Sequence, residues 1–327
     1  MQILAGDIGG TNTRLALYQV HANNRLEPIK EASFPSGDFP GLEAILQRFL
    51  ADSDSQAIAR ACFGIAGPVI DQVCEATNLP WRVSADEIRL AFGFEAVWLL
   101  NDLEANAWGI EALPVEDLFL LNPGKPQARG NRSIISAGTG LGEAGIYWDG
   151  SQYRPFSSEG GHADFSPGTP LEFELQQWLS AQFGHVSWER LVSGPGLESL
   201  YSFLLDNRRQ SMPAWLNELV TQQGLAPTIS QVALAAKDPI CVEALDLFLT
   251  LYGREAGNHA LKLMATGGVF LGGGIAPRIL PRLEAGGFLA AFLDKGRMGP
   301  LMASMPIYVI LNDKAALLGA ARFASLQ

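Results

Sequence analysis

The sequence has few charged residues and few cysteines, and it lacks long apolar runs. Only 17% of the 327 residues are charged and 48% are hydrophobic, a balance typical of globular proteins and unlike that of disordered chains. No run approaches the roughly 18 apolar residues of a transmembrane helix, so none is expected. The three cysteines, Cys62, Cys74 and Cys241, fit neither a zinc site nor a redox pair, and packed thiols in a reducing compartment are expected.

Basic residues are also in deficit, since 23 Lys and Arg face 34 Asp and Glu for a net charge of −11. An acidic surface repels nucleic acid and anionic membranes, so neither is an expected partner. It repels nucleotides too, and any phosphate site has to be built locally from backbone N–H groups and a cation. The residues from Met1 to Asp7 lack the positive start of a signal peptide, and a cytoplasmic location is expected.

The P-loop pattern GxxxxGK[ST] is absent, so a nucleotide would have to bind through other glycine-rich turns. Two such turns lie between short apolar runs, one over residues 3–18 and the other over residues 134–147. Apolar runs separated by glycines predict β-hairpins. Two similar hairpins, each opening one half of the chain, predict a duplicated α/β domain.

The remaining pattern is that of an α/β protein. Helical spacing predicts helices over 41–51, 84–92 and 103–110, with Ser84 and Glu87 as a capping box. Residues 171–263 are expected to be mostly helical, and residues 313–326 to form a last helix packed on the first domain. Strands are predicted over 57–65, 96–100, 266–271 and 306–311, and the segment 114–131, rich in Pro, Gly and polar residues, is the expected domain boundary.

The first glycine-rich turn can bind phosphate. Glycine allows φ > 0, so successive N–H groups can converge on one anion, and neighbouring hydroxyl and amide side chains add hydrogen bonds. An aspartate beside such a turn is suited to Mg²⁺, which takes one or two carboxylates and keeps its waters. A plain hairpin turn is an equally good reading of this segment alone. The residues concerned are Asp7, Gly9, Gly10, Thr11 and Asn12.

Two further glycine clusters follow strands. Gly138, Thr139 and Gly140 are not a dinucleotide fingerprint, because a strand follows them where that motif needs a helix. Gly272, Gly273 and Gly274 end a strand and open a helix, which suits close approach of a phosphate or a flat ligand. Packing glycines at a helix start are the alternative for the last cluster.

Asn101 and Asp102 follow an apolar strand and precede a helix. Ligands of open α/β sheets bind at the carboxyl ends of the strands. Asp102 there is either an ordinary N-cap or a general base that takes the proton of an attacking hydroxyl.

Ionisable side chains also surround a Gly-Gly bend in the second half of the chain. Glu159, His162 and Asp164 flank it, and Glu189 follows next to Arg190. No other His or Cys supports a zinc site here. Sugar hydroxyls both donate and accept hydrogen bonds, so a carboxylate with an imidazole and an amide suits a sugar.

Taken together, these segments resemble the bacterial glucokinase family of the actin, Hsp70 and sugar-kinase superfamily, nearly end to end. The resemblance rests on the two glycine turns, the triple glycine, Asn101-Asp102, the loop from Glu159 to His162, and Glu189-Arg190. The segments 64–68 and 77–81 also resemble the family's sugar-side loop. The cysteine-rich zinc motif of the related sugar-kinase and repressor group is missing, so the chain resembles the zinc-free branch.

The resemblance implies an α/β fold of two ribonuclease-H-like, actin-like ATPase domains flanking a cleft. The small domain would span 1–112, completed by residues 306–327, and the large domain 113–305. It also implies ATP and Mg²⁺ as cofactors, with Asp7 near the metal, and glucose as substrate. Asp102 would act as general base in the first step of glycolysis, Asn101, Glu159, His162 and Glu189 would hold sugar hydroxyls, and a homodimer is expected.

Rival functions remain open from the sequence. A broader hexose kinase or a sugar-sensing protein without turnover would use the same pocket, although no DNA-binding module is evident. An ATPase of the actin type would leave the Glu159–His162 segment without a role. A glycosidase using Asp102 and Glu159 would leave the glycine turns unexplained.

Overall fold

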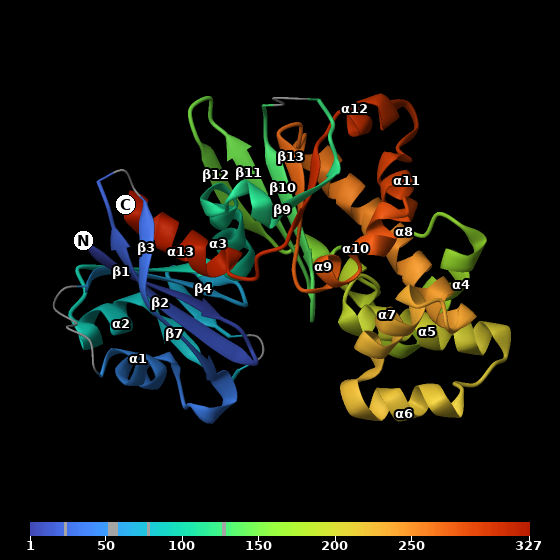
Figure 1. Cartoon of the computed structure of the whole chain (residues 1–327), viewed down its shortest axis with the longest axis horizontal. Helices are drawn as coiled ribbons and strands as arrows, with labels where there is room; N and C mark the ends of the chain where they lie inside the picture. Colours follow the sequence, from blue (N-terminus) through green and yellow to red (C-terminus); the bar gives the residue numbers. More distant parts are fainter. Residues whose placement is uncertain (23–24, 52–57, 77–78, 126–128) are drawn as a thin grey trace. The chain divides into compact units, whose positions relative to one another are not determined.

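The chain folds into two compact units. The computed structural model describes residues 1–22, 25–51, 58–76, 79–125 and 129–327. The first unit comprises Met1–Asp117, Arg154–Ser157 and Asn312–Gln327, and the second comprises Leu118–Tyr153 and Ser158–Leu311 (Figure 1). Among the described residues, no helix is long and apolar enough to cross a membrane. The three cysteines are buried free thiols, as expected.

A five-stranded sheet in the order β3-β2-β1-β4-β8 forms the centre of the first unit. β1 runs antiparallel to β2 and parallel to β4, and β4 runs parallel to β8. The predicted hairpin and both predicted strands of this half are confirmed, although Ala57 lies outside the described residues. The strands are β1 (Gln2–Ile8), β2 (Asn12–Val20), β3 (Leu26–Pro35), β4 (Ile58–Ile65) and β8 (Ala96–Asn101), with a small sheet of β5 (Val69–Ile70), β6 (Val73–Glu75) and β7 (Arg82–Ser84).

Alternating burial along β1 places a core on each face of this sheet. Leu4 and Ile8 join the core formed with α1 (Leu42–Leu50) and α2 (Ala85–Phe92). Ile3 and Ala5, which alternate with them along the strand, lie on the opposite face and join the core formed with the last helix. The period of two is that of a strand buried on both faces. The Ser84 side chain accepts a hydrogen bond from the Glu87 N–H at 3.4 Å, so Ser84 is the predicted N-cap of α2.

The last helix, α13 (Ala315–Leu326), packs on α3 (Asp102–Gly109), β1 and β4. Two glycines allow this contact. A Cβ on Gly319 would collide with the Ala105 carbonyl, and one on Gly109 would collide with the Ala315 carbonyl. The backbones of α3 and α13 therefore touch directly, and the prediction that the last helix completes the first domain is confirmed at the level of α13.

The second unit repeats the arrangement of the first. Its sheet has the order β12-β11-β10-β13-β14-β9, and of these strands only the middle of β12, Arg154–Ser157, is grouped with the first unit. β10 runs antiparallel to β11 and parallel to β13, and β13 runs parallel to β14, as β1 does with β2 and β4, and β4 with β8. The predicted duplication is thus confirmed. The strands are β9 (Leu118–Asn122), β10 (Arg132–Ala137), β11 (Leu141–Trp148), β12 (Tyr153–Ser158), β13 (Gly268–Gly272) and β14 (Ile307–Ile310).

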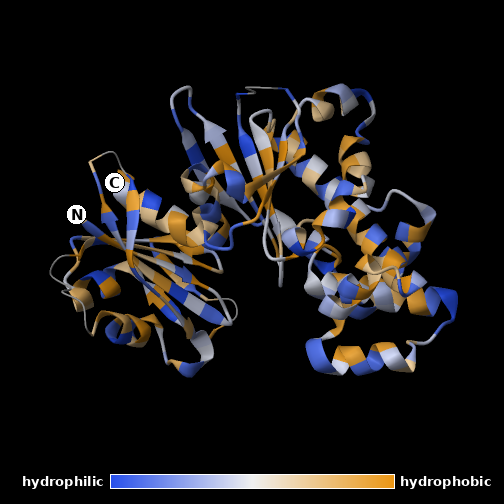
Figure 2. Cartoon of the chain, in the orientation of Figure 1, coloured by the Kyte–Doolittle hydropathy of each residue, from blue (hydrophilic) through white to orange (hydrophobic). Residues whose placement is uncertain are grey.

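Helices supply the rest of the second core, as predicted for residues 171–263. Apolar residues, orange in Figure 2, run along the strands of each sheet, and those of β10, β13 and β14 share one core with the long helix α8. The helices are α4 (Pro170–Phe183), α5 (Gly194–Arg208), α6 (Ala214–Gln223), α7 (Leu225–Leu234), α8 (Pro239–Leu263), α9 (Ile275–Arg278), α10 (Leu280–Glu284), α11 (Gly287–Leu293) and α12 (Gly299–Ala303).

Two segments differ from the sequence-based assignment. Within 114–131, the expected domain boundary, the first unit ends at Asp117, but the residues that follow are not all loop, because Leu118–Asn122 forms β9, the edge strand that pairs with β14. Residues from 306 onward were assigned to the first domain as one piece. They divide instead, because Ile307–Ile310 pair with β13 in the second sheet whereas α13 lies in the first unit.

Candidate functional site

In the first unit, three strands end at one edge of the sheet. Ile8 of β1 is in register with Ile65 of β4, which is in register with Asn101 of β8. The Asn101 Nδ2 donates to the Gly67 carbonyl oxygen at 3.1 Å, which ties the loop after β4 to the end of β8. Because parallel strands end together, the first glycine turn and Asp102 lie along the same edge.

A buried serine holds the first glycine turn in place. The Ser36 N–H donates to the Thr11 carbonyl oxygen at 2.9 Å, and its Oγ donates to the Gly9 carbonyl oxygen at 2.7 Å. Within the turn, the Gly9 N–H donates to the Asn12 carbonyl oxygen at 3.0 Å. Gly9 and Gly10 do not adopt the left-handed φ that the sequence analysis invoked, and that reason for the two glycines is wrong. Sequence reasoning missed Ser36, because an isolated serine in a loop carries no signal.

Asp7 is a poorly solvated carboxylate at the end of β1. Burial raises the pKa of Asp7 to about 6, the Arg14 charge opposes this rise, and the Asp313 charge adds to it. Arg14 itself pairs with Asp313, with Nη2 2.8 Å from Oδ2. A carboxylate in such a place gains from a nearby dication. In the described part of the chain, no group of three or more acidic, His or Cys side chains is placed to hold a metal ion.

Asn101, not Asp102, is the N-cap of α3. Its Oδ1 accepts the N–H groups of Leu103 and Glu104 at 3.0 and 3.4 Å. Asp102 is the first residue of the helix, with its Oδ1 2.9 Å from the Leu103 nitrogen. The reading of Asp102 as an ordinary N-cap is therefore wrong. Asn101 is 7% exposed and uses its amide within the first unit, which orients the residue that follows it.

The second glycine turn lies in the second unit and contacts Glu189. The Gly138 N–H donates to the Gly140 carbonyl oxygen at 2.9 Å, and the Gly138 carbonyl accepts from the Gly194 N–H at 2.8 Å. A Cβ on Gly140 would collide with Glu189 Oε2, and this oxygen accepts the Leu141 N–H at 2.9 Å. A Cβ on Gly138 would meet no atom within 4 Å, so packing does not explain that glycine.

The predicted sugar-binding side chains of this half gather around the same turn. His162 Nε2 lies 3.9 Å from Glu159 Oε2, and the two side chains are 61% and 60% exposed. The Trp188 N–H donates to the Ala163 carbonyl oxygen at 3.1 Å, which brings Glu189 beside the loop that carries His162. The second unit therefore holds the exposed side chains of Glu159 and His162 near the Glu189 carboxylate, which accepts the Leu141 N–H of β11.

The triple glycine is explained mainly by packing. Gly273 has φ +79°, and a Cβ there would collide with the Ala137 carbonyl; one on Gly272 would collide with Ser136 Oγ. Only a Cβ on Gly274 would face open space. The predicted helix follows as α9, which has four residues and contains Pro277. Of the segment 77–81 in the expected sugar-side loop, Thr77 and Asn78 lie outside the described residues.

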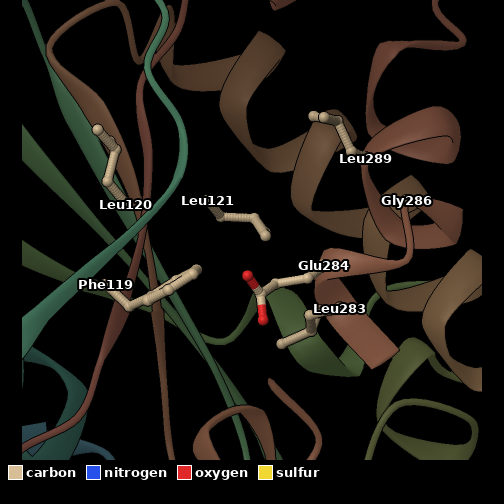
Figure 3. A pocket seen from close by; sticks show the side chains of 7 residues that line it. All are labelled: Phe119, Leu120, Leu121, Leu283, Glu284, Gly286 and Leu289. Atoms are coloured by element: carbon tan, nitrogen blue, oxygen red, sulfur yellow. The ribbon is translucent and has the colours of Figure 1, made fainter. Parts of the chain in front are cut away.

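A hollow between β9, α10 and α11 contains none of these residues. Figure 3 shows the Glu284 carboxylate pointing into it among apolar side chains. Sugar hydroxyls need several polar partners, and a single carboxylate does not supply them. The lining residues are Phe119, Leu120, Leu121, Leu283, Glu284, Gly286 and Leu289.

Another buried carboxyl, Glu255 of α8, lies outside the predicted site. Its Oε2 accepts from Asn258 Nδ2 at 2.9 Å, whereas Oε1 has no hydrogen-bond partner among the described residues. Burial, with the negative charge of Glu143 adding to it, raises the pKa of Glu255 to about 7. The folded chain therefore keeps this proton to a higher pH than an unfolded chain does.

We expect wild type to lose stability relative to a Glu255→Gln variant as the pH rises. Folding takes up a proton between the ordinary pKa of 4.5 and about 7, so the free energy of unfolding falls as the pH rises through this window. Between pH 5 and pH 8 the difference between the two proteins should change by about 2–3 kcal/mol. Urea unfolding at both pH values measures it, and a difference independent of pH would contradict the expectation.

Comparisons with known proteins agree with this arrangement. A family model described as Glucokinase matches residues 4–327. The glucokinase of Nostoc punctiforme is 40% identical over 336 residues, covering 99% of this chain and 98% of its own length. The crystal structure of a glucokinase from an Antarctic psychrotroph is 31% identical with a TM-score of 0.86, covering 100% of this chain and 99% of its own.

A more distant structure shares the fold. It is a ROK-family glucokinase from Streptomyces griseus, solved in complex with glucose and AMPPNP, and it covers 100% of both chains at 22% identity with a TM-score of 0.67. These likenesses confirm the predicted α/β fold with two domains of the actin-like ATPase type.

Proposed function

The chain belongs to the glucokinase family, and from this membership we propose that it transfers the γ-phosphate of ATP to the 6-hydroxyl of glucose. The products are glucose 6-phosphate and ADP. One observation above all supports the proposal. Asp102 and the glycine turn after β1 lie along a single sheet edge of the first unit, through the register of Ile8, Ile65 and Asn101.

Asp102 is the proposed general base. It takes the proton of the 6-hydroxyl as that oxygen forms its bond to the γ-phosphorus, while the bond to the bridging oxygen breaks and ADP leaves. Its place at the start of α3 is fixed by the Asn101 cap. Phosphoryl transfer requires mainly positioning and charge stabilisation, so a rigidly held carboxylate suits it.

The other sugar hydroxyls are assigned to Glu159, His162 and Glu189. Glu159 and His162 have exposed polar ends, and Glu189 is fixed by the Leu141 N–H. Asn101 completes the set through its position beside Asp102, although its own amide is largely occupied by the cap.

The nucleotide is assigned to the glycine turns, with Mg²⁺ beside Asp7. Gly138 and Gly274 face open space, which is the expected property of backbone that a ligand approaches. Thr11, Asn12 and Thr139 add side-chain hydrogen bonds to phosphate. Mg²⁺, when bound, neutralises charge on the phosphates, and Asp7 fits it because its carboxyl is poorly solvated.

A coupled assay tests the proposal. ATP with glucose should give ADP and glucose 6-phosphate, and mannose, fructose and galactose should react more slowly. Equal rates with all four sugars would support a broader hexose kinase instead. Glucose binding without turnover would support a sugar-sensing protein, and ATP hydrolysis indifferent to sugar would support an ATPase.

A further inference from the structure

A buried ion pair joins β11 to α8 in the second unit. His259 Nδ1 lies 3.1 Å from Glu143 Oε2, and the two side chains are 5% and 2% exposed. The other ring nitrogen, Nε2, lies 3.1 Å from the Ala144 carbonyl oxygen. With Glu143 as a carboxylate, both neighbours are acceptors, so both ring nitrogens donate and the ring is an imidazolium. None of the site residues discussed above uses this pair.

The Glu143 carboxylate also forms the floor of the bend after Glu159. A Cβ on Gly160 would collide with Glu143 Oε2, the oxygen that faces His259. A Cβ on Gly161 would collide with the carbonyl oxygen of Leu141, two residues earlier on β11. The Gly160–Gly161 bend therefore packs directly on β11, and the Glu143 carboxylate sets how closely the bend approaches the strand.

His259 supplies the positive charge that faces the Glu143 carboxylate. Its Oε1 has no hydrogen-bond partner among the described residues, so compensation of the charge falls on Oε2. Burial lowers the pKa of His259, but its hydrogen bond to Glu143 and the negative charge there outweigh burial and raise that pKa overall. Removing the imidazolium would leave a buried, uncompensated carboxylate. That carboxylate would have to take up a proton or move toward water, and the Gly160–Gly161 bend lies against it.

We propose that Glu143 and His259 are positioning residues for the segment Glu159–His162. The pair holds the Gly160–Gly161 bend at a fixed distance from β11. This distance sets the directions of the Glu159 and His162 side chains. The role in sugar binding rests on the proposed function, whereas the coupling of the pair to the bend does not.

Kinetics of two variants test the role in sugar binding. His259→Leu should raise KM for glucose about tenfold and change KM for ATP less than about twofold, because only the segment Glu159–His162 shifts. Adding Glu143→Gln removes the orphaned charge at constant side-chain size, and the double variant should recover most of the lost affinity. Equal rises in both KM values, or no recovery in the double variant, would overturn the proposal.

A matched control separates positioning from stability. Asp238 caps the other end of α8, where its Oδ1 accepts the Cys241 N–H at 2.8 Å. It lies roughly 30 Å along the helix axis from His259, at 1.5 Å per residue. Asp238→Ala should lower the melting temperature and leave both KM values unchanged. If Asp238→Ala raises KM for glucose as His259→Leu does, the effect is one of stability.

Hydrogen exchange of the free protein tests the coupling without any sugar. The His162 N–H bonds the Glu159 carbonyl at 3.0 Å, and the Ala163 N–H bonds the Gly160 carbonyl at 2.9 Å. Both amides should exchange faster in His259→Leu and not in Asp238→Ala. Unchanged exchange would overturn the proposal, whereas faster exchange in a protein that does not phosphorylate glucose would refute only the proposed function.

A gentler variant covers the case in which His259→Leu does not fold. Glu143→Asp keeps the charge but withdraws the carboxylate by one methylene from Gly160. The same rise in KM for glucose and the same faster exchange are expected, and wild-type values in both measurements would overturn the proposal.

Discussion

Asp102→Asn should lower kcat for glucose phosphorylation by about 10²- to 10⁴-fold, the range that a positioned general base contributes. The amide keeps the size of the side chain and can still accept the Leu103 N–H, but it cannot take the proton of the attacking hydroxyl. Glucose affinity, measured by calorimetry without ATP, should change little. A loss in kcat with retained binding locates the effect in the chemical step.

Asp86→Asn is the matched control. Asp86 also lies in the first turn of a helix of the first unit, α2, and its side chain is 86% exposed. Its pair with Arg89 contributes little at such exposure. The control should retain wild-type kcat. If Asp102→Asn were equally active, Asp102 would not be the base, and the function of that sheet edge would have to be reassigned.

Glu159→Gln should raise KM for glucose roughly 10- to 100-fold, because a hydrogen bond to a charged group contributes about 1.5–3 kcal/mol. KM for ATP should stay within about twofold, since the proposed contact of the Glu159 side chain is with the sugar and not with the nucleotide. Initial rates at varied glucose and at varied ATP measure both constants. A selective rise in KM for ATP would assign this loop to the nucleotide.

Asp164→Asn is the control in the same loop. Asp164 also faces a histidine, with its Oδ1 3.3 Å from His185 Nδ1, and its side chain is 90% exposed. This pair is as exposed as Glu159 and His162, but no sugar contact is assigned to it. Asp164→Asn should therefore leave both KM values near those of wild type.

The repeated hairpins were predictable because their glycines interrupt apolar runs that are long enough to read. β9 was not, because Pro123 and Gly124 follow directly and an edge strand needs only a short, half-exposed run. The sequence also does not show that residues 306–327 are divided between the two units. Which sheet a short apolar strand joins depends on which sheet has an unpaired edge strand within its reach. Ile307–Ile310 pair with β13.

For the site, the sequence indicates the residues proposed to contact ligands. It does not indicate the residues that keep those side chains in position. Asp102 follows a recognisable strand end, and Glu159 directly precedes two glycines. Ser36, Glu143 and His259 do not, because each sits within an ordinary segment and acts across more than 15 residues of chain. The choice between Asn101 and Asp102 as cap also required coordinates, since both residue types cap helices well.

The packing of α13 on β1, β4 and α3 has a consequence for how the chain is made. One face of the first sheet carries Ile3, Ala5 and Cys62, and it is covered by Ala316, Leu317 and Ala320. Roughly 200 residues separate Asp117 from Asn312, so a ribosome adding about 5–20 residues per second needs about 10–40 seconds to supply the cover. During that interval the nascent chain carries an open apolar sheet face, and the part that emerges first is the last to reach its native state.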